Sequence, residues 1–552
     1  MELLMRYKRN EEFIMSIALI NGKIHTMNSD EIVEAILIDN DKISMVGTTN
    51  NIMEYVSNKD EIIDLEGHVV IPGLNDSHLH ALLTAQKMQQ IDLCNARSTT
   101  DLINITQNNW PDDLKQGDWV IGRGWNQDYF DVKEFPTKDD LDKISTETPI
   151  CLIRACIHIC VVNSKALEII NLDKNNLPQL DDGKIYIDDN GDLNGLFSEG
   201  ALGYVYSNLP ILEVDDIKDL IVRFADHVNA QGITSVQSDD FTALPGVQYE
   251  TIMKAYQELD TEGKLNLKVY QQCLLPKVDL LQDFINKSYH ISEGFNNYRI
   301  GPLKLLLDGS LGARTAVLEG NYHDEDINGI SIYNDEELFS LGNIAQNNNI
   351  QMAIHGIGDG AINQILDLYE KLEKENPKED LRHGIVHCQI TEAVALKRIR
   401  DINAVVYAQP IFLHYDIHMV EDRVGVEKAR TSYAFKTLIE EGVSLSLGTD
   451  SPVESTSPFH NIYCAVARKD LSGNMIHSWN EKECLSVQQA VYAYTYEGAY
   501  QSFEENIKGS LEVGKQADLI VLNQDIFNID FENINDTEVL KTMLDGKLIY
   551  SK

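Results

Sequence analysis

The chain has 552 residues, 43% of them hydrophobic, which indicates two or three globular domains with a large core. Asp and Glu outnumber Lys and Arg by 87 to 46, and this acidic balance argues against nucleic acid or a membrane surface as a partner, because both require basic patches. The first fourteen residues do not resemble a secretory signal, no apolar run approaches the roughly 20 residues that span a bilayer, and the eight cysteines are scattered, so a cytoplasmic protein is expected.

Both ends of the chain show short strand patterns separated by turns. Residues 16–19 and 23–27 flank Asn21-Gly22, which is typical of a hairpin, and the C-terminal end repeats this texture around Asp545-Gly546. The further strand candidates at the two ends are 35–38, 43–46, 517–522, 539–544 and 547–550. We therefore expect one small β-sandwich domain that is made from both termini, residues 15–68 and 504–552.

The middle of the chain alternates apolar strand patterns with helical ones, which predicts βα units and a parallel sheet. The helix expected over residues 216–230 has its apolar residues on one face. The strand candidates are 69–74, 233–237, 267–272, 303–307, 351–354, 384–386, 404–408 and 443–447. Eight such strands close a (β/α)₈ TIM barrel, which we expect to comprise residues 69–92 and 209–503.

Residues 93–208 are too many for a single connection between the first two barrel strands. They include a further strand candidate at 150–155 and a polar, turn-rich stretch at 173–192. We interpret this segment as an insertion after the first strand that forms a cap over the active site.

The pair His78 and His80 carries the strongest chemical signal. Residues two apart on a strand project to the same side, so both imidazoles are expected to point at the C-terminal rim of the first barrel strand. Two imidazoles that converge on one point suit a divalent transition metal, whereas the alternative is two hydrogen-bonded histidines in a loop. The preceding Pro-Gly and Asp76 favour the metal site.

Three more strand candidates end in residues that bind metals or transfer protons. His355 ends the fifth strand, His387 ends the sixth, and Asp450 follows the eighth. Each alone is more simply a hydrogen-bonded polar residue, but accidents would not place such residues repeatedly at the same end of successive strands. The joint pattern predicts one site at the mouth of the barrel.

Lys304 is the single charge within the apolar run of the fourth strand. A buried ammonium without a partner is unfavourable, and burial lowers the pKa of a lysine so that the neutral amine becomes available. A neutral lysine can take up carbon dioxide to form a carbamate that bridges two metal ions. The alternative is a lysine paired with Asp308 or another acid, and the sequence leaves both interpretations open.

The chain resembles the amidohydrolase superfamily and, within it, the amidohydrolase-3 (YtcJ-like) branch. The resemblance covers nearly all of the chain and rests on PGLNDSHLH at 72–80, GWNQDYF at 124–130, HICVVNSKAL at 158–167, KLLLDGSLGARTA at 304–316, HGIGDGAI at 355–362, GTDSPV at 448–453 and GSLEVGKQADLIVLNQD at 509–525. It implies that the metal-site residues are His78, His80, His355, His387 and Asp450. It further implies that Asp450 is the catalytic carboxylate, which takes a proton from water, and that Lys304 occupies the position that is carboxylated in two-metal members.

The candidate substrate-binding residues lie in the insertion and after the fourth strand. They are Trp125, Asn126, His158, Asp308 and Arg314. The first three either reach the pocket or pack within the cap, and the last two either fix their loop or, for Arg314, contact an anionic substrate. The branch often has Glu before the sixth-strand histidine, where this chain has Val386, which affects the support of the metal ligands and the substrate preference.

These residues suit hydrolysis of a non-peptide C–N bond, as in an amide, an N-formyl or N-acyl compound, or a cyclic amide. A metal ion lowers the pKa of water from 15.7 toward about 7 and polarises a carbonyl oxygen. We expect a small-molecule substrate and one or two divalent ions, with Zn²⁺ as the expected metal. A homodimer is one option for the assembly of the chain. The alternatives are a non-hydrolytic reaction on the same scaffold, such as isomerisation or decarboxylation, and a binding protein without turnover.

Overall fold

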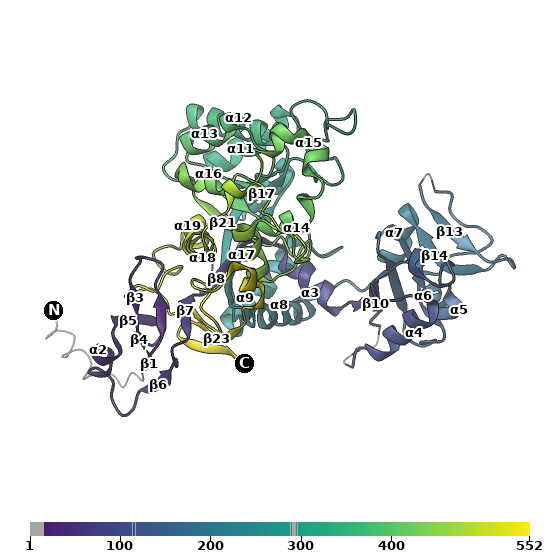
Figure 1. Cartoon of the computed structure of the whole chain (residues 1–552). Coiled ribbons are helices and arrows are strands. Elements are labelled where there is room, and N and C mark those ends of the chain that lie inside the picture. Colours follow the sequence, from purple (N-terminus) through teal and green to yellow (C-terminus); the bar gives the residue numbers. More distant parts are fainter. Residues whose placement is uncertain are drawn as a thin grey trace. The chain divides into compact units, whose positions relative to one another are not determined.

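The computed structural model describes residues 16–112, 114–115, 117–180, 182–287, 289, 294 and 296–552 (Figure 1). The first fourteen residues, on which the expected lack of a secretory signal depends, lie outside the described residues, as does the first residue of the segment 15–68. The chain divides into two compact units. One contains the described residues up to Leu83 together with Val214–Lys552, and the other is Thr84–Glu213.

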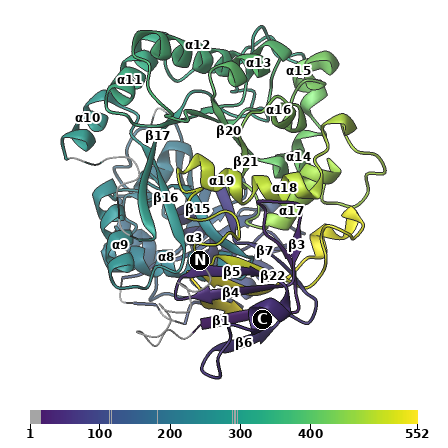
Figure 2. The same ribbon diagram turned by 90° about the vertical axis from the view of Figure 1, so that its left-hand side faces the viewer.

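The first unit is built around an eight-stranded sheet in which all paired neighbours run parallel. The strands follow one another in chain order around a barrel, and helices lie outside them (Figure 2). They are β8 (Leu74–Leu79), β15 (Ile233–Asp239), β16 (Lys268–Leu274), β17 (Tyr298–Leu306), β18 (Met352–Gly356), β19 (Gly384–His387), β20 (Val405–Ala408) and β21 (Leu445–Leu447). The predicted (β/α)₈ barrel is confirmed.

The helix α8 (Val214–Asn229) shows how the sequence covers the barrel. Its apolar residues recur at three- and four-residue steps, so that Ile217, Phe224 and Val228 are buried while the acidic residues face outward. The other helices of this unit are α2 (Thr49–Met53), α9 (Tyr249–Thr261), α10 (Val278–Asn286), α11 (Asp335–Asn347), α12 (Asp359–Glu375), α13 (Ala393–Asp401), α14 (Leu413–Asp416), α15 (Val420–Ala429), α16 (Phe435–Glu440), α17 (Pro458–Ala467), α18 (Val487–Ala493) and α19 (Tyr496–Gln501). Its short 3₁₀ helices are η3 (Pro410–Phe412), η4 (Glu481–Glu483) and η5 (Phe531–Asp536).

The first barrel strand differs from the expected one. The apolar run 69–74 is divided at Gly73: β7 (Val69–Pro72) pairs with strands of the small β domain, and the barrel strand β8 begins only at Leu74. The apolar run is continuous, so the sequence gives no sign of where one strand ends and the next begins. The structure shows that the chain passes close to Thr234 at this point, because a Cβ on Gly73 would lie 2.2 Å from Thr234 Oγ1. His78 therefore lies inside β8, and His80 directly follows this strand.

The barrel closes between β8 and the loop after β21. The backbone N–H of Asp450 donates to the carbonyl oxygen of His78 (2.8 Å), and the hydroxyl of Thr449 donates to the buried Asp76 (2.7 Å). A Cβ at Gly448 would lie 2.5 Å from the backbone nitrogen of His78, so only glycine permits this approach. The closure brings Asp450 next to the His78–His80 pair.

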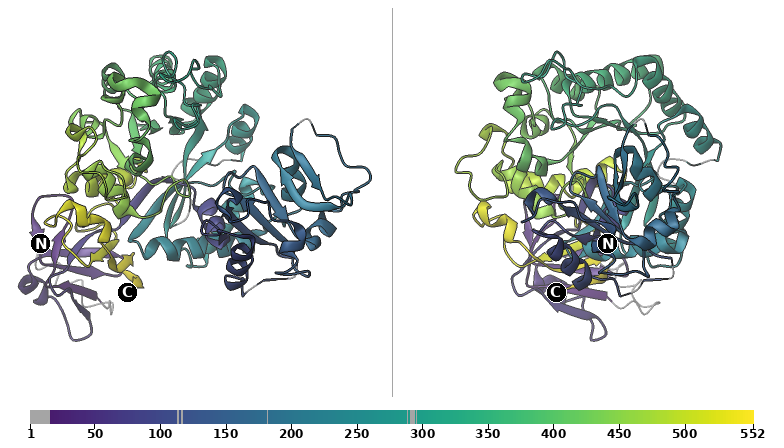
Figure 3. Two further views of the ribbon diagram at one scale, coloured as in Figure 1. Left: turned by 45° about the vertical axis from the view of Figure 1, so that its right-hand side comes forward. Right: turned by 90° about the vertical axis from the view of Figure 1, so that its right-hand side faces the viewer.

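A small β domain is made from both ends of the described chain, which lie side by side as purple and yellow segments in Figure 3. One sheet has the order β5-β4-β1-β6 and the other β24-β23-β22-β7-β2-β3, with β7 paired antiparallel to β22. The strands are β1 (Ser16–Ile20), β2 (Lys23–His25), β3 (Ile32–Val33), β4 (Ala35–Asp39), β5 (Lys42–Gly47), β6 (Glu61–Asp64), β22 (Leu519–Leu522), β23 (Val539–Leu544) and β24 (Lys547–Ser551). The prediction of a terminal β domain is confirmed.

The second unit, Thr84–Glu213, contains the predicted insertion 93–208 and has its own six-stranded sheet, ordered β13-β14-β12-β11-β10-β9. Its strands are β9 (Ile91–Asp92), β10 (Val120–Trp125), β11 (Ile150–Arg154), β12 (Ile159–Val162), β13 (Lys184–Ile187) and β14 (Leu193–Ser198). The helix α3 (Ala81–Gln89) follows β8 and leads into this unit. The helices within the unit are α4 (Thr99–Asn108), η1 (Gln127–Tyr129), α5 (Lys138–Leu141), α6 (Ser164–Ile170), η2 (Glu199–Ala201) and α7 (Leu202–Tyr206).

Across the part of the chain that the structure describes, no helix has both the length and the apolar composition needed to cross a lipid bilayer.

Candidate metal centre

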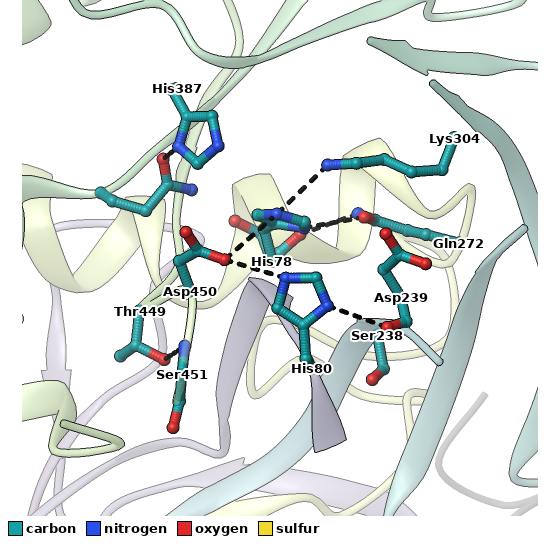
Figure 4. Close-up of polar contacts among 12 residues, drawn as sticks. His78, His80, Ser238, Asp239, Gln272, Lys304, His387, Thr449, Asp450 and Ser451 are labelled. Carbon is teal, nitrogen blue, oxygen red and sulfur yellow. Dashed lines mark hydrogen bonds and ion pairs between the residues drawn. The ribbon is translucent and has the colours of Figure 1, made fainter. Parts of the chain in front are cut away.

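Three side chains converge at the C-terminal end of the barrel, two from barrel strands and one from the loop after β21. His78, His387 and Asp450 each offer one ligand atom, and these atoms lie within 4.8 Å of one another. All three residues are buried, and His78 Nε2 lies 3.5 Å from Asp450 Oδ1. In Figure 4, His78 and His80 lie between Asp450 and His387 on one side and Lys304 on the other.

A cavity of about 270 Å³ surrounds this cluster. All of the predicted metal-site residues line it, namely His78, His80, Lys304, His355, His387 and Asp450. His80 Nε2 lies 3.1 Å from Asp450 Oδ1, and the ring of His355 is centred 4.5 Å from that of His387. The structure therefore brings together residues that are separated by up to 372 positions, as the strand-end pattern predicts.

Each of the four histidines is oriented through its Nδ1 atom. Nδ1 of His78 contacts Gln272 Oε1 (2.8 Å), and Nδ1 of His80 contacts the carbonyl oxygen of Asp239 (2.9 Å). The other two contacts join His355 to Asp308 Oδ1 (2.9 Å) and His387 to Gln409 Oε1 (2.7 Å). These acceptors hold a ring proton on Nδ1, so Nε2 of each ring is the atom left to bind a cation when the ring is neutral, which is the arrangement of a metal-binding histidine.

The charges of the cluster also suit a cation. Burial lowers the pKa of His78 and of His387 and so favours the neutral ligand form. Burial acts to raise the pKa of Asp450, but the hydrogen bond from His80 and the nearby histidines outweigh it and hold that pKa well below its usual range. Burial likewise acts to lower the pKa of His80, yet Asp450 raises it to about 9. A cation in the cavity would compete with this proton for both side chains.

Lys304 is fully buried on β17, with Nζ 3.2 Å from His78 Nε2. Burial lowers the pKa of Lys304 to about 8, against the opposing charges of Asp239 and Asp450. Within the described ranges no carboxylate lies within 4.0 Å of Nζ, and Asp308 contacts His355 instead. The interpretation of Lys304 as the ion-pair partner of Asp308 is thus wrong.

Asp308 fixes the loops beneath His355. Its Oδ1 accepts from His355 and from the N–H of Ile357 (3.1 Å), and its Oδ2 accepts from the N–H groups of Val317 (3.0 Å) and Gly358 (2.9 Å). With its side chain fully buried and both oxygens engaged, Asp308 holds its loop and does not present a free carboxylate to a substrate.

Replacing Asp308 by Ala should lower the free energy of unfolding by at least about 2 kcal/mol, because three backbone N–H groups lose their acceptor. Urea unfolding of the purified variant measures this loss. Asp324→Ala is the control, since it removes only partly exposed ion pairs, with Arg314 and Arg423, and should cost about 1 kcal/mol or less. Equal losses in the two variants would contradict the anchoring role of Asp308.

The other candidate substrate-binding residues are also engaged. Arg314 forms ion pairs with Asp324 (2.8 Å) and Glu325 (3.2 Å), which favours the loop-fixing interpretation.

Trp125 is buried in the core of the insertion unit and donates from Nε1 to the carbonyl of Leu152 (3.0 Å), so it packs within that unit, as the packing alternative predicts. Asn126 caps η1 and accepts from Arg154 (2.8 Å), and the exposed His158 contacts Glu199 (2.9 Å).

Sequence reasoning missed three residues at this end of the barrel. Asp239 ends β15, Gln272 lies near the end of β16, and Gln409 follows β20. The signal that identified the histidines, a polar residue at the end of an apolar strand, was available for all three. Glutamine rarely binds transition metals, so its presence at a strand end does not by itself predict a metal site. Here Gln272 orients His78 and Gln409 orients His387.

The donor set fits a divalent transition metal. Neutral imidazole nitrogens with one ionised carboxylate are the ligands of catalytic zinc sites and of related metals. Residues 61–550 match the model of the Amidohydrolase family. The chain belongs to this family.

Relatives of known name or structure agree with the family match. The chain is 31% identical over 534 residues to YtcJ of Bacillus subtilis (strain 168), which is named as an amidohydrolase. The match covers 96% of this chain and 98% of YtcJ. An uncharacterized metal-dependent hydrolase from Pyrococcus furiosus superposes with a TM-score of 0.77 at 30% identity, over 93% of this chain and 100% of that chain. An N-substituted formamide deformylase from Arthrobacter pascens is 23% identical over 97% of this chain and 98% of its own. This amidohydrolase is a metal-dependent hydrolase.

Proposed function

We propose that this amidohydrolase cleaves a non-peptide C–N bond of a small amide, with one or two divalent ions, chiefly Zn²⁺, held by the predicted histidines and Asp450. The observation that supports this proposal is the convergence of His78, His387 and Asp450, whose ligand atoms lie within 4.8 Å of one another. A metal-dependent hydrolase needs ligands and a proton acceptor in the same place, and Asp450 supplies an ionised carboxylate there.

Asp450 is the proton acceptor of the proposed reaction. A bound divalent cation supplies Lewis-acid chemistry, since it polarises a carbonyl and acidifies water. The Oδ1 atom of Asp450 accepts the proton of the attacking water and then passes it to the departing nitrogen. Its backbone N–H is fixed on the carbonyl of His78, so the carboxylate keeps its position during the transfer.

The cavity favours a small substrate with an apolar group. Its volume of about 270 Å³ is near the lower limit of small-molecule sites, and its lining includes Leu83 of α3 together with Leu274 and Leu306 of the barrel strands. The relative from Arthrobacter pascens is named for deformylation of N-substituted formamides, and this supports N-formyl compounds as the first substrates to test.

The test is incubation of the Zn²⁺-loaded protein with a panel of N-formyl, N-acyl and cyclic amides, followed by mass spectrometry of the products. We expect equal amounts of acid and amine from at least one compound with an apolar N-substituent, or the ring-opened amino acid from a cyclic amide. Conversion of a compound into an isomer, or loss of carbon dioxide, would favour the non-hydrolytic alternative. Tight binding of a compound without any conversion would favour the binding protein.

A further inference from the structure

Asp239 lines the cavity of the candidate metal centre and, like the predicted histidines, stands at the C-terminal end of a barrel strand. It is the last residue of β15, its residue exposure is 4%, and it lines the same cavity as the predicted ligands. Its carbonyl oxygen accepts from His80 Nδ1, so its backbone is fixed within the cluster. In Figure 4 its carboxylate lies on the Lys304 side of the His78–His80 pair, across from Asp450.

The carboxylate of Asp239 has a buried atom without a partner. Its Oδ1 is inaccessible to water and has no hydrogen-bond donor among the described residues. The adjacent Asp240 is just as buried, but its Oδ1 accepts from the N–H of Leu82 (2.9 Å) and its Oδ2 accepts from the hydroxyl of Tyr256 (2.8 Å). Burial of a carboxylate oxygen without a donor is unfavourable, so a structure that keeps Asp239 in this state needs another partner for it.

Charge balance indicates what this partner is. Four neutral histidines would leave the charge of a bound divalent ion unchanged, and Asp450 would compensate one of its two positive charges. A second carboxylate facing the same cavity compensates the other. Carboxylate oxygen is a common ligand of divalent metals, and Lys304 Nζ is too distant from Asp239 to form a direct ion pair with it.

We propose that Asp239 is a metal ligand, which donates a carboxylate oxygen to a divalent cation on the side of the cavity next to His80 and Lys304. This inference rests on the metal site of the proposed function. It extends the donor set beyond the histidines and Asp450, and it explains why a buried acid at the end of the second barrel strand faces the cavity without a hydrogen-bond donor.

The test is a Zn²⁺ titration of the metal-free, full-length protein, with competition against a chelator of known affinity. Asp239→Asn should weaken Zn²⁺ binding by at least about 10-fold, the lower end of what even outer-shell partners contribute, or should lose one ion of the stoichiometry. The matched control is Asp240→Asn, which changes the neighbouring buried acid and should leave the titration unchanged. Binding by Asp239→Asn with the affinity and stoichiometry of the natural protein would overturn the proposal.

Thermal unfolding of the metal-free proteins separates a lost ligand from a damaged fold. Metal-free Asp239→Asn should melt at or above the temperature of the natural protein, because the substitution removes an unpaired buried carboxylate. In Asp239→Cys, a Co²⁺ ion should show a thiolate-to-cobalt charge-transfer band that Asp240→Cys lacks, and the absence of this band would count against Asp239 as a ligand. Hydrolysis plays no part in these measurements, so a lack of amide turnover would contradict only the proposed function.

Discussion

Asp450→Asn is expected to lower kcat by about 10²- to 10⁴-fold, which is the usual contribution of a positioned proton-transfer group. Asparagine keeps the shape of the side chain, but it cannot accept a proton from water. The low pKa of Asp450 means that the natural residue is ionised at neutral pH and is ready to act as the acceptor. Steady-state kinetics with the best amide of the substrate panel measure the effect.

Two controls separate the loss of the proton acceptor from a loss of metal and from a general effect of changing an acid. Elemental analysis should show that Asp450→Asn still binds metal when Zn²⁺ is in excess, because the four histidines remain. Asp416→Asn also changes an acid, a partly buried one that accepts from the hydroxyl of Tyr433 (2.6 Å) and does not line the cavity. This variant should keep its turnover, and a loss comparable to that of Asp450→Asn would argue against a specific role for Asp450.

Removal of the metal with a chelator is expected to abolish hydrolysis and to lower the thermal stability. A cation that binds only the folded protein stabilises it by about 4 kcal/mol when its concentration is 1,000 times the dissociation constant. The metal-free protein should therefore unfold at a lower temperature, and both turnover and stability should return when Zn²⁺ is added back. Differential scanning calorimetry and the amide assay, run on the same samples, measure the two effects.

Two histidines of one strand region provide the matched variants for this experiment. His387 ends β19 and lines the cavity, whereas His383 precedes β19, accepts from the backbone N–H of Met352 (3.0 Å) and contacts Gln346 (2.8 Å). Burial lowers the pKa of both rings. His387→Ala should weaken Zn²⁺ binding and reduce the stabilisation by Zn²⁺, while His383→Ala should reduce stability and keep Zn²⁺ binding. The reverse outcome would place the metal elsewhere.

Local signals were sufficient for the barrel and for the six predicted residues that line the cavity at its C-terminal end. The two-residue period of a strand put His78 and His80 on the same side, and the polar residues after apolar strands placed His355, His387 and Asp450 at the same end of the sheet. Parallel strands in one barrel have their C-terminal ends on the same face, so this pattern required no knowledge of distances. The short strands at both ends of the chain predicted the terminal β domain in the same way.

Only the tertiary structure decided which side chains support the site and which do not. The acceptor on each Nδ1 comes from another segment of the chain, as with Gln272 for His78 and Asp308 for His355, and no local pattern encodes such a pairing. The sequence around Trp125 is compatible with a pocket or with a hydrophobic core, and only the packing of the insertion unit shows that this side chain belongs to its core.

The sequence by itself determined the barrel and the strand ends that carry the predicted metal-site residues. Packing determined the rest, including the division at Gly73, the loop-fixing role of Asp308 and the buried carboxylate of Asp239. The physical reason is that the hydrophobic periodicity of a sequence indicates only which side of its own strand or helix a residue faces. Partners, burial and unpaired atoms depend on contacts between segments hundreds of residues apart.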